Sequence, residues 1–161
     1  RLDMEIKQIR DPQQKMKIST DILKMLPEWF GIPEAVEDYI HYSSNMPFFA
    51  VYSQSKAVGF IAIKENNRYT AEVYVMGVNP NYHRRGIGRA LISSAVKWCW
   101  EHGYEFLQVK TLDKSHPDKN YACTRKFYEA MGFRPLECIP ELWGKDNPCL
   151  IMVMYIGEEQ F

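Results

Sequence analysis

Residues 75–91 read VMGVNPNYHRRGIGRAL, and this is the most informative stretch of the sequence. A strand-like run ends in a turn, after which Gly86-Ile87-Gly88 opens a helical pattern over residues 86–102. A helix N-terminus presents unpaired amides and the positive end of the helix dipole, which suits phosphate oxygens. Glycines at 86 and 88 would let the backbone approach a pyrophosphate without a clash from Cβ. Three basic side chains add attraction for an anion: Arg84, Arg85 and Arg89.

Other phosphate-binding loops fit this stretch less well. A dinucleotide-binding fingerprint would need glycine at position 91, which is Leu91, and the Gly-Lys-Ser/Thr of a P-loop is absent. The structural alternative is a solvated basic turn with capping glycines.

The rest of the chain predicts an α/β (α+β) fold with the order β-α-α-β-β-β-α-β-α-β-β. Three strands in hairpin succession, followed by helical crossovers, predict a mixed sheet with helices on both faces. We expect one domain over residues 4–157, with residues 1–3 a vector remnant or a disordered start. The expected strands are 4–9, 48–52, 58–64, 69–78, 106–111, 133–139 and 149–156, and the expected helices are 13–26, 33–44, 86–102 and 117–131.

Composition excludes several classes of function. The 161 residues include 20 Lys+Arg and 20 Asp+Glu, so the formal net charge is zero, which disfavours nucleic acid or an anionic membrane as the main partner. The four cysteines form no CxxC pair and have no histidine at zinc-like spacing, so we expect reduced thiols, no metal and a cytoplasmic location. No apolar run is long enough to span a membrane.

Residues 83–88, His-Arg-Arg-Gly-Ile-Gly, resemble the Gln/Arg-x-x-Gly-x-Gly/Ala pyrophosphate loop of the GNAT superfamily of acetyl-CoA-dependent N-acetyltransferases. Residues 125–133 resemble the end of that family's fourth helix. The resemblance covers essentially the whole chain and implies a mostly antiparallel sheet of six to seven strands. Residues 26–31, 46–50 and 142–149 further resemble a bacterial subgroup without an assigned acceptor.

The resemblance implies acetyl-CoA as co-substrate. The strand before the loop would face the thioester and pantetheine, and Gly77 in this strand suggests a bulge or the close approach of a ligand. The alternative is that Gly77 packs against a helix. The first position of the loop is His83, where the family has Gln or Arg. The family often has a pantetheine-binding Asn at the position that is Tyr121 in this chain, and here Asn120 stands one residue earlier. The expected cofactor-binding residues are Met76, Gly77, Val78, His83, Arg84, Arg85, Gly86, Ile87, Gly88, Arg89, Asn120 and Tyr121.

Two residues are expected to carry the chemistry. Tyr128 resembles the family's thiolate-protonating tyrosine, and an ordinary core tyrosine would have the same spacing. Glu72 interrupts an apolar strand, where a partly buried carboxylate with a raised pKa would serve as general base. The alternatives are that Glu72 binds a cationic substrate or a neighbouring Lys or Arg, and that a water chain is the base.

The acceptor is expected between the first two helices and the last hairpin, as in the family. Residues 28–38 carry four acids and no base among aromatic side chains, which suits an amine and equally a solvated helix face. The expected acceptor-binding residues are Trp29, Phe30, Glu34, Tyr74 and Trp143.

These features predict acetyl transfer from acetyl-CoA to a primary amine of a small molecule or a peptide or protein. The alternatives are a non-catalytic coenzyme-A sensor and an aminoglycoside-type antibiotic acetyltransferase. A homodimer is left open.

Overall fold

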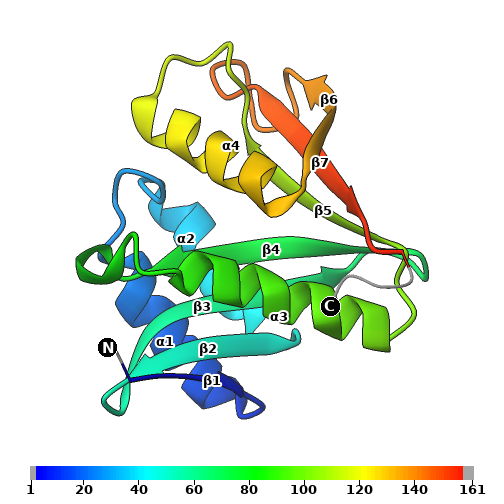
Figure 1. Ribbon diagram of the computed structural model, residues 1–161. Helices are drawn as coiled ribbons and strands as arrows, with labels where there is room; N and C mark the ends of the chain where they lie inside the picture. The colour runs from blue at the N-terminus through cyan, green and yellow to red at the C-terminus, as the bar shows by residue number, and fades with distance from the viewer. Residues whose placement is uncertain (1–2, 158–161) are drawn as a thin grey trace. The chain divides into compact units, whose positions relative to one another are not determined.

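The computed structural model describes residues 3–157, and its elements follow the predicted order (Figure 1). Every expected helix and strand is present, with ends shifted by a few residues. The elements are β1 (Met4–Gln8), α1 (Pro12–Leu23), α2 (Pro33–Ser43), β2 (Phe48–Ser53), β3 (Lys56–Glu65), β4 (Thr70–Val78), α3 (Ile87–Glu101), β5 (Phe106–Leu112), α4 (Lys119–Met131), β6 (Arg134–Ile139) and β7 (Cys149–Tyr155).

The strands form a seven-stranded sheet in the order β1-β2-β3-β4-β5-β7-β6. The pairs β1–β2, β2–β3, β5–β7 and β6–β7 are antiparallel, so the predicted mostly antiparallel sheet is confirmed. The chain divides into two compact units, which we describe separately. The first holds the residues up to Lys64 and Val73–Trp98, and the second holds Glu65–Glu72 and the chain from Cys99 onward.

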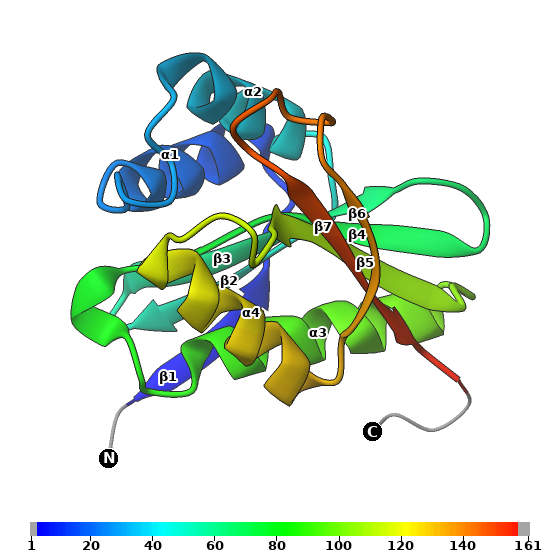
Figure 2. The same ribbon diagram turned by 90° about the horizontal axis from the view of Figure 1, so that it is seen from above.

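In the first unit, α1 and α2 lie on one face of the strands and α3 lies on the other (Figures 1 and 2). Helix α1 begins at Asp11, whose carboxylate accepts a hydrogen bond from Gln14 N at 3.3 Å. The side chains of α1 that face the sheet, including Ile22 and Leu23, are buried. They belong to a core in which the rings of Phe48 and Phe60 stack at 5.2 Å. Burial of these apolar side chains fixes α1 on the sheet.

A glycine in β3 lets α3 approach the sheet closely. A Cβ built at Gly59 would lie 2.7 Å from Cγ2 of Ile87 and 3.3 Å from Cδ1 of Leu91. These two residues lie one turn apart at the start of α3 and are buried. The N-terminus of α3 can therefore sit directly on β3 only because position 59 has no side chain.

In the second unit, β7 lies between β5 and β6, and α4 packs against β5. Lys110 on β5 is paired with Ile151 on β7. The buried side chains Leu107, Phe133 and Met152 belong to the interior of this unit. The β6–β7 loop, residues 140–148, joins the last two strands.

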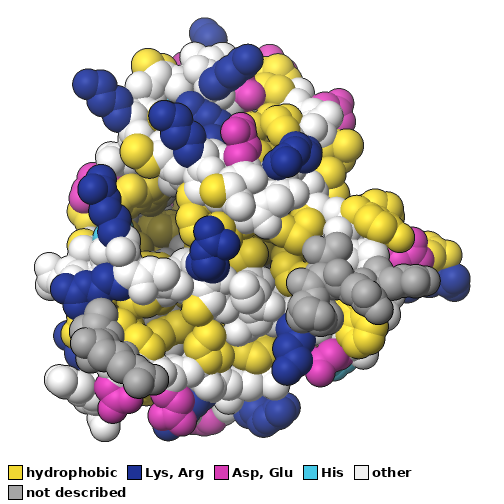
Figure 3. Space-filling model, in the orientation of Figure 1, with side chains coloured by type: hydrophobic (Ala, Val, Ile, Leu, Met, Phe, Trp, Pro, Cys, Tyr) yellow, Lys and Arg dark blue, Asp and Glu magenta, His cyan; other side chains and the backbone are white. Residues whose placement is uncertain are grey.

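The surface of the described part of the chain mixes charges. Lys and Arg side chains are dispersed among acidic and hydrophobic ones on the face shown in Figure 3. Among residues 3–157, no helix has the length and apolar character needed to cross a bilayer. The same residues contain no cluster of three or more His, Cys, Asp or Glu side chains able to hold a metal ion.

Candidate functional site

The turn that follows β4 is held rigidly by Asn79. Asn79 is 1% exposed, its amide donates to Val58 O at 2.8 Å, and its side chain accepts a hydrogen bond from Asn81 N at 2.9 Å. These bonds start the short 3-10 turn Pro80–Tyr82. These bonds therefore fix the direction of the chain after β4, and residues 83–86 lead from this turn to the start of α3.

Gly86 opens α3 from a left-handed backbone conformation. Its φ is +79°, and no atom lies within 4 Å of the place where a Cβ would stand. The bond from Ala90 N to Gly86 O at 3.0 Å closes the first turn of the helix. The amides of Gly86, Ile87 and Gly88 precede that bond and belong to the unpaired first turn of a helix. This open, positively polarised end fits a diphosphate group, as the sequence predicts.

The three arginines of the loop are exposed, and Arg84 adopts a left-handed conformation with φ +63°. The guanidinium of Arg85 lies 5.1 Å from the centre of the Tyr82 ring, a cation–π contact. Arg89 lies within the first turn of α3. The positive charge of this loop is thus available to an anionic ligand and adds to the helix dipole.

Gly77 packs against α1. A Cβ at this position would lie 3.0 Å from Cγ2 of Ile22, 3.2 Å from Cδ1 of Leu26 and 3.3 Å from Cε1 of Phe60. The structure therefore supports the packing alternative for this glycine. Its neighbours Met76 and Val78 are partly exposed, as alternation along a strand requires.

Helix α4 holds Tyr128 in the second unit. Its N-cap Asp118 accepts hydrogen bonds from Asn120 N at 2.8 Å and Tyr121 N at 3.1 Å, so both expected pantetheine-binding residues lie in the first turn. The helix ends at Gly132, whose φ is +108°.

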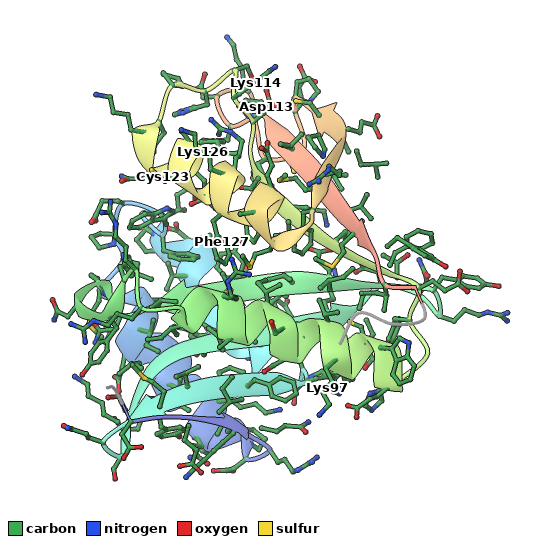
Figure 4. The ribbon with its side chains drawn as sticks, viewed as in Figure 1. Lys97, Asp113, Lys114, Cys123, Lys126 and Phe127 are labelled. Carbon is green, nitrogen blue, oxygen red and sulfur yellow. The ribbon has the colours of Figure 1, made fainter. Side chains whose placement is uncertain are left out.

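Tyr128 is 7% exposed, and its ring meets that of Phe133 edge-on at 5.5 Å. The two residues just before Tyr128, Lys126 and Phe127, point to different sides of α4 (Figure 4). Arg125 ties the helix to the end of β5 by a hydrogen bond from Nη1 to Leu112 O at 2.6 Å. The tyrosine ring is therefore held in place by packing and by a fixed helix.

Glu72 is the centre of a buried polar network in the second unit. Its side chain is 6% exposed and forms a salt bridge with Lys110 Nζ at 3.0 Å. Asn66 Nδ2 and Gln108 Nε2 also donate to its Oε1, each at 3.0 Å. The interpretation of Glu72 as the partner of a neighbouring lysine is confirmed, and that lysine comes from β5.

The expected raised pKa of Glu72 is wrong. Burial alone would raise the pKa of this carboxyl, but the hydrogen bonds from Gln108, Asn66 and Lys110 and the charge of Lys110 outweigh burial. The pKa of Glu72 is therefore lowered, and the carboxylate is a weak base at neutral pH.

Removal of the Glu72 side chain should destabilise the fold. We expect Glu72→Ala to lower the free energy of unfolding by about 3 kcal/mol, because it leaves the Lys110 ammonium without its partner. Lys110→Met in the same background should restore part of the loss. Urea denaturation of the two variants measures the effect, and an equal loss in both would contradict a coupled pair.

The pH dependence of stability follows from the lowered pKa. A carboxyl whose pKa is lower in the folded state stabilises the fold above its unfolded pKa, for which the ordinary value is 4.5. This contribution is lost as the pH falls through the folded pKa. Wild type should therefore lose stability below about pH 4.5 more steeply than Glu72→Gln, and parallel denaturation curves over this range would refute the assignment.

The expected acceptor-binding residues of the first unit come together around the segment between α1 and α2. The Phe30 ring meets Tyr39 at 5.7 Å, and Tyr39 meets Tyr74 of β4 at 5.3 Å. The acids of this region are exposed and, within the described chain, form no salt bridge: Glu28, Glu34, Glu37 and Asp38. Trp143 belongs to the second unit, in the β6–β7 loop, and is 39% exposed.

Comparison with known proteins identifies the family of the chain. The profile described as "Acetyltransferase (GNAT) family" matches residues 16–133. The chain belongs to the GNAT acetyltransferase family. An uncharacterised N-acetyltransferase of Methanocaldococcus jannaschii is 28% identical over 98 residues, which are 57% of this chain and 41% of that protein. The chain thus spans about two fifths of this curated relative.

Solved GNAT structures share the fold. The ribosomal-protein-S18-alanine N-acetyltransferase of Escherichia coli has a TM-score of 0.75 at 17% identity, with 99% of each chain covered. An aminoglycoside 6'-N-acetyltransferase complexed with coenzyme A has a TM-score of 0.76 at 20% identity, covering 98% of this chain and 99% of that one. At these identities the likeness shows the GNAT fold alone.

Sequence reasoning missed several residues that shape the loop in the first unit and the polar network in the second unit. The importance of Gly59 could have been predicted, because a glycine inside a strand often marks the close approach of another element. The sequence gives weaker evidence for Lys110 and Gln108, which alternate with buried residues along β5. The buried side chain of Asn79, directly after β4, could have been found from its position before a proline turn.

Proposed function

We propose that the protein transfers the acetyl group of acetyl-CoA to a primary amine. The observation that carries this proposal is the left-handed Gly86 at the open N-terminus of α3, flanked by three exposed arginines. Family membership gives the fold in which this loop would hold a coenzyme A diphosphate. The chain's residues fit the group, because the loop offers unpaired amides, positive charge and unfilled space.

The chemistry requires a nucleophilic amine, stabilisation of an oxyanion and protonation of a leaving thiolate. The amine nitrogen forms a bond to the thioester carbonyl carbon, the carbon–sulfur bond breaks, and the amine gives up a proton. We assign Tyr128 as the acid that protonates the thiolate. Its phenol is placed by a rigid helix, which suits a proton donor that must be held in one position.

The lowered pKa of Glu72 favours a water molecule as the base. Three nitrogen donors surround Oε1 of this carboxylate, and Lys110 also lies 3.3 Å from Oε2. Hydrogen bonds and a positive charge beside a carboxylate lower its affinity for a proton. Glu72 then has a structural role, in which it holds Lys110 and Gln108 of β5.

The acceptor is proposed to be a cationic amine. The four exposed acids in residues 28–38 and the aromatic rings beside them would attract an ammonium group and pack against its carbon chain. The structural neighbours include an acetyltransferase for aminoglycosides and one for a ribosomal protein. Small amines, aminoglycosides and peptide amines therefore all belong in the test.

Two assays test the proposal together. Coenzyme A is expected to raise the melting temperature, and acetyl-CoA should release free thiol in the presence of at least one amine class. The panel should contain polyamines, aminoglycosides and peptides with a free N-terminal or lysine amine. Absence of any thermal shift would overturn the proposal, whereas a shift without acetylated product across the panel would favour a non-catalytic coenzyme-A sensor.

A further inference from the structure

The loop after β4 contacts the segment between α1 and α2 through the rings of His83 and Trp29. The centroids of the Trp29 and His83 rings lie 6.2 Å apart at an interplanar angle of 80°, an edge-on contact. Both residues belong to the first unit. Trp29 lies in the segment expected to face the acceptor, and His83 opens the loop expected to hold the diphosphate.

His83 is also bonded to the end of β4. Its Nε2 lies 2.9 Å from Val78 O. A carbonyl oxygen can only accept, so Nε2 carries the proton and donates this bond. One exposed side chain therefore ties together the last residue of the strand, the loop and Trp29.

The segment that carries Trp29 is anchored at a second point. The amide of Trp29 donates to Leu26 O at 3.2 Å, and the amide of Phe30 donates to the same oxygen at 3.0 Å. Phe30 then continues the ring contacts to Tyr39 and Tyr74. A movement of Trp29 would be transmitted to the aromatic side chains next to it, since the two residues share one tight turn.

We propose that His83 is a positioning residue that couples occupancy of the diphosphate loop to the position of Trp29. This inference rests on the proposed function, because it takes coenzyme A as the ligand of the loop. A ligand that orders residues 83–89 also fixes His83, and the ring contact passes that change to Trp29. Coupling between two binding sites is reciprocal, so an acceptor bound beside Trp29 would in turn strengthen coenzyme A binding.

Fluorine NMR of protein labelled with fluorotryptophan tests the coupling. The chain has four tryptophans, and single Trp→Phe substitutions assign their resonances. At saturating coenzyme A, the Trp29 resonance of wild type is expected to shift. In His83→Ala and in His83→Gln the shift should be lost even at saturation, because neither side chain provides the aromatic ring. Glutamine keeps an N–H donor for Val78 O, so His83→Gln separates the ring contact from the hydrogen bond.

The control is His102→Ala, which removes an exposed histidine just after α3 and should keep the wild-type response. An unmoved Trp29 resonance in wild type saturated with coenzyme A would overturn the coupling and leave the proposed function intact. An equal shift in His83→Gln would also overturn it. Calorimetry on the same samples reports whether coenzyme A binds at all, and absence of binding would overturn both proposals.

Discussion

Gly86→Asp is expected to weaken coenzyme A binding by at least about tenfold. The new carboxylate would lie at the open end of α3, where the proposed diphosphate is held. Repulsion between two unit charges 4 Å apart costs about 1 kcal/mol in water and about 4 kcal/mol near a protein surface, and about 1.4 kcal/mol corresponds to a tenfold change in affinity. Titration calorimetry with coenzyme A measures the loss.

Gly103→Asp is the matched control for this prediction. Gly103 has the same φ of +79°, and no atom lies within 4 Å of the place of its Cβ. The two variants therefore introduce the same side chain on the same backbone conformation, with a comparable cost to folding of about 1 kcal/mol. Gly103→Asp should bind coenzyme A as wild type does, and equal weakening by both variants would mean that the loop is not the cofactor site.

Tyr128→Phe is expected to lower kcat by about 100-fold or more with little change in the affinity for acetyl-CoA. A positioned general acid contributes roughly 10²- to 10⁴-fold to rate, and removal of the hydroxyl takes away the proton donor for the thiolate. The ring itself stays, so the contact with Phe133 and the packing of α4 are kept. Steady-state kinetics with an acceptor from the amine panel measures the change.

Tyr104→Phe provides the comparison for the tyrosine. Tyr104 donates a hydrogen bond from its hydroxyl to Glu65 in the same unit, away from any expected catalytic role. This variant loses a hydroxyl and a hydrogen bond but should retain kcat. Unchanged turnover in Tyr128→Phe, or an equal fall in both variants, would contradict the assignment of Tyr128 as the acid.

Local patterns in the sequence were sufficient to predict the elements and the glycine turn that opens α3. The glycines and arginines of residues 84–89 act within a few residues of chain, and Gly86 does adopt the conformation for which glycine is suited. The stop of α4 at Gly132 follows from the same kind of local rule.

The chemical state of Glu72 could not be predicted in this way. Alternation along β4 places its side chain on a face of the sheet but does not say which strand lies beside it. Two of the three donors that lower its pKa, Gln108 and Lys110, come from β5, which follows α3 in the chain. The contact between Trp29 and His83 could not be predicted either, because it depends on how two turns far apart in the sequence pack together.

The most direct test of the central claim is a backbone amide NMR spectrum recorded with and without coenzyme A. The largest changes in shift, together with slower hydrogen exchange, are expected on the amides of residues 86–89 at the start of α3. Large changes confined to other parts of the chain, or no change at saturating coenzyme A, would contradict the assignment of this loop as the site that holds the cofactor.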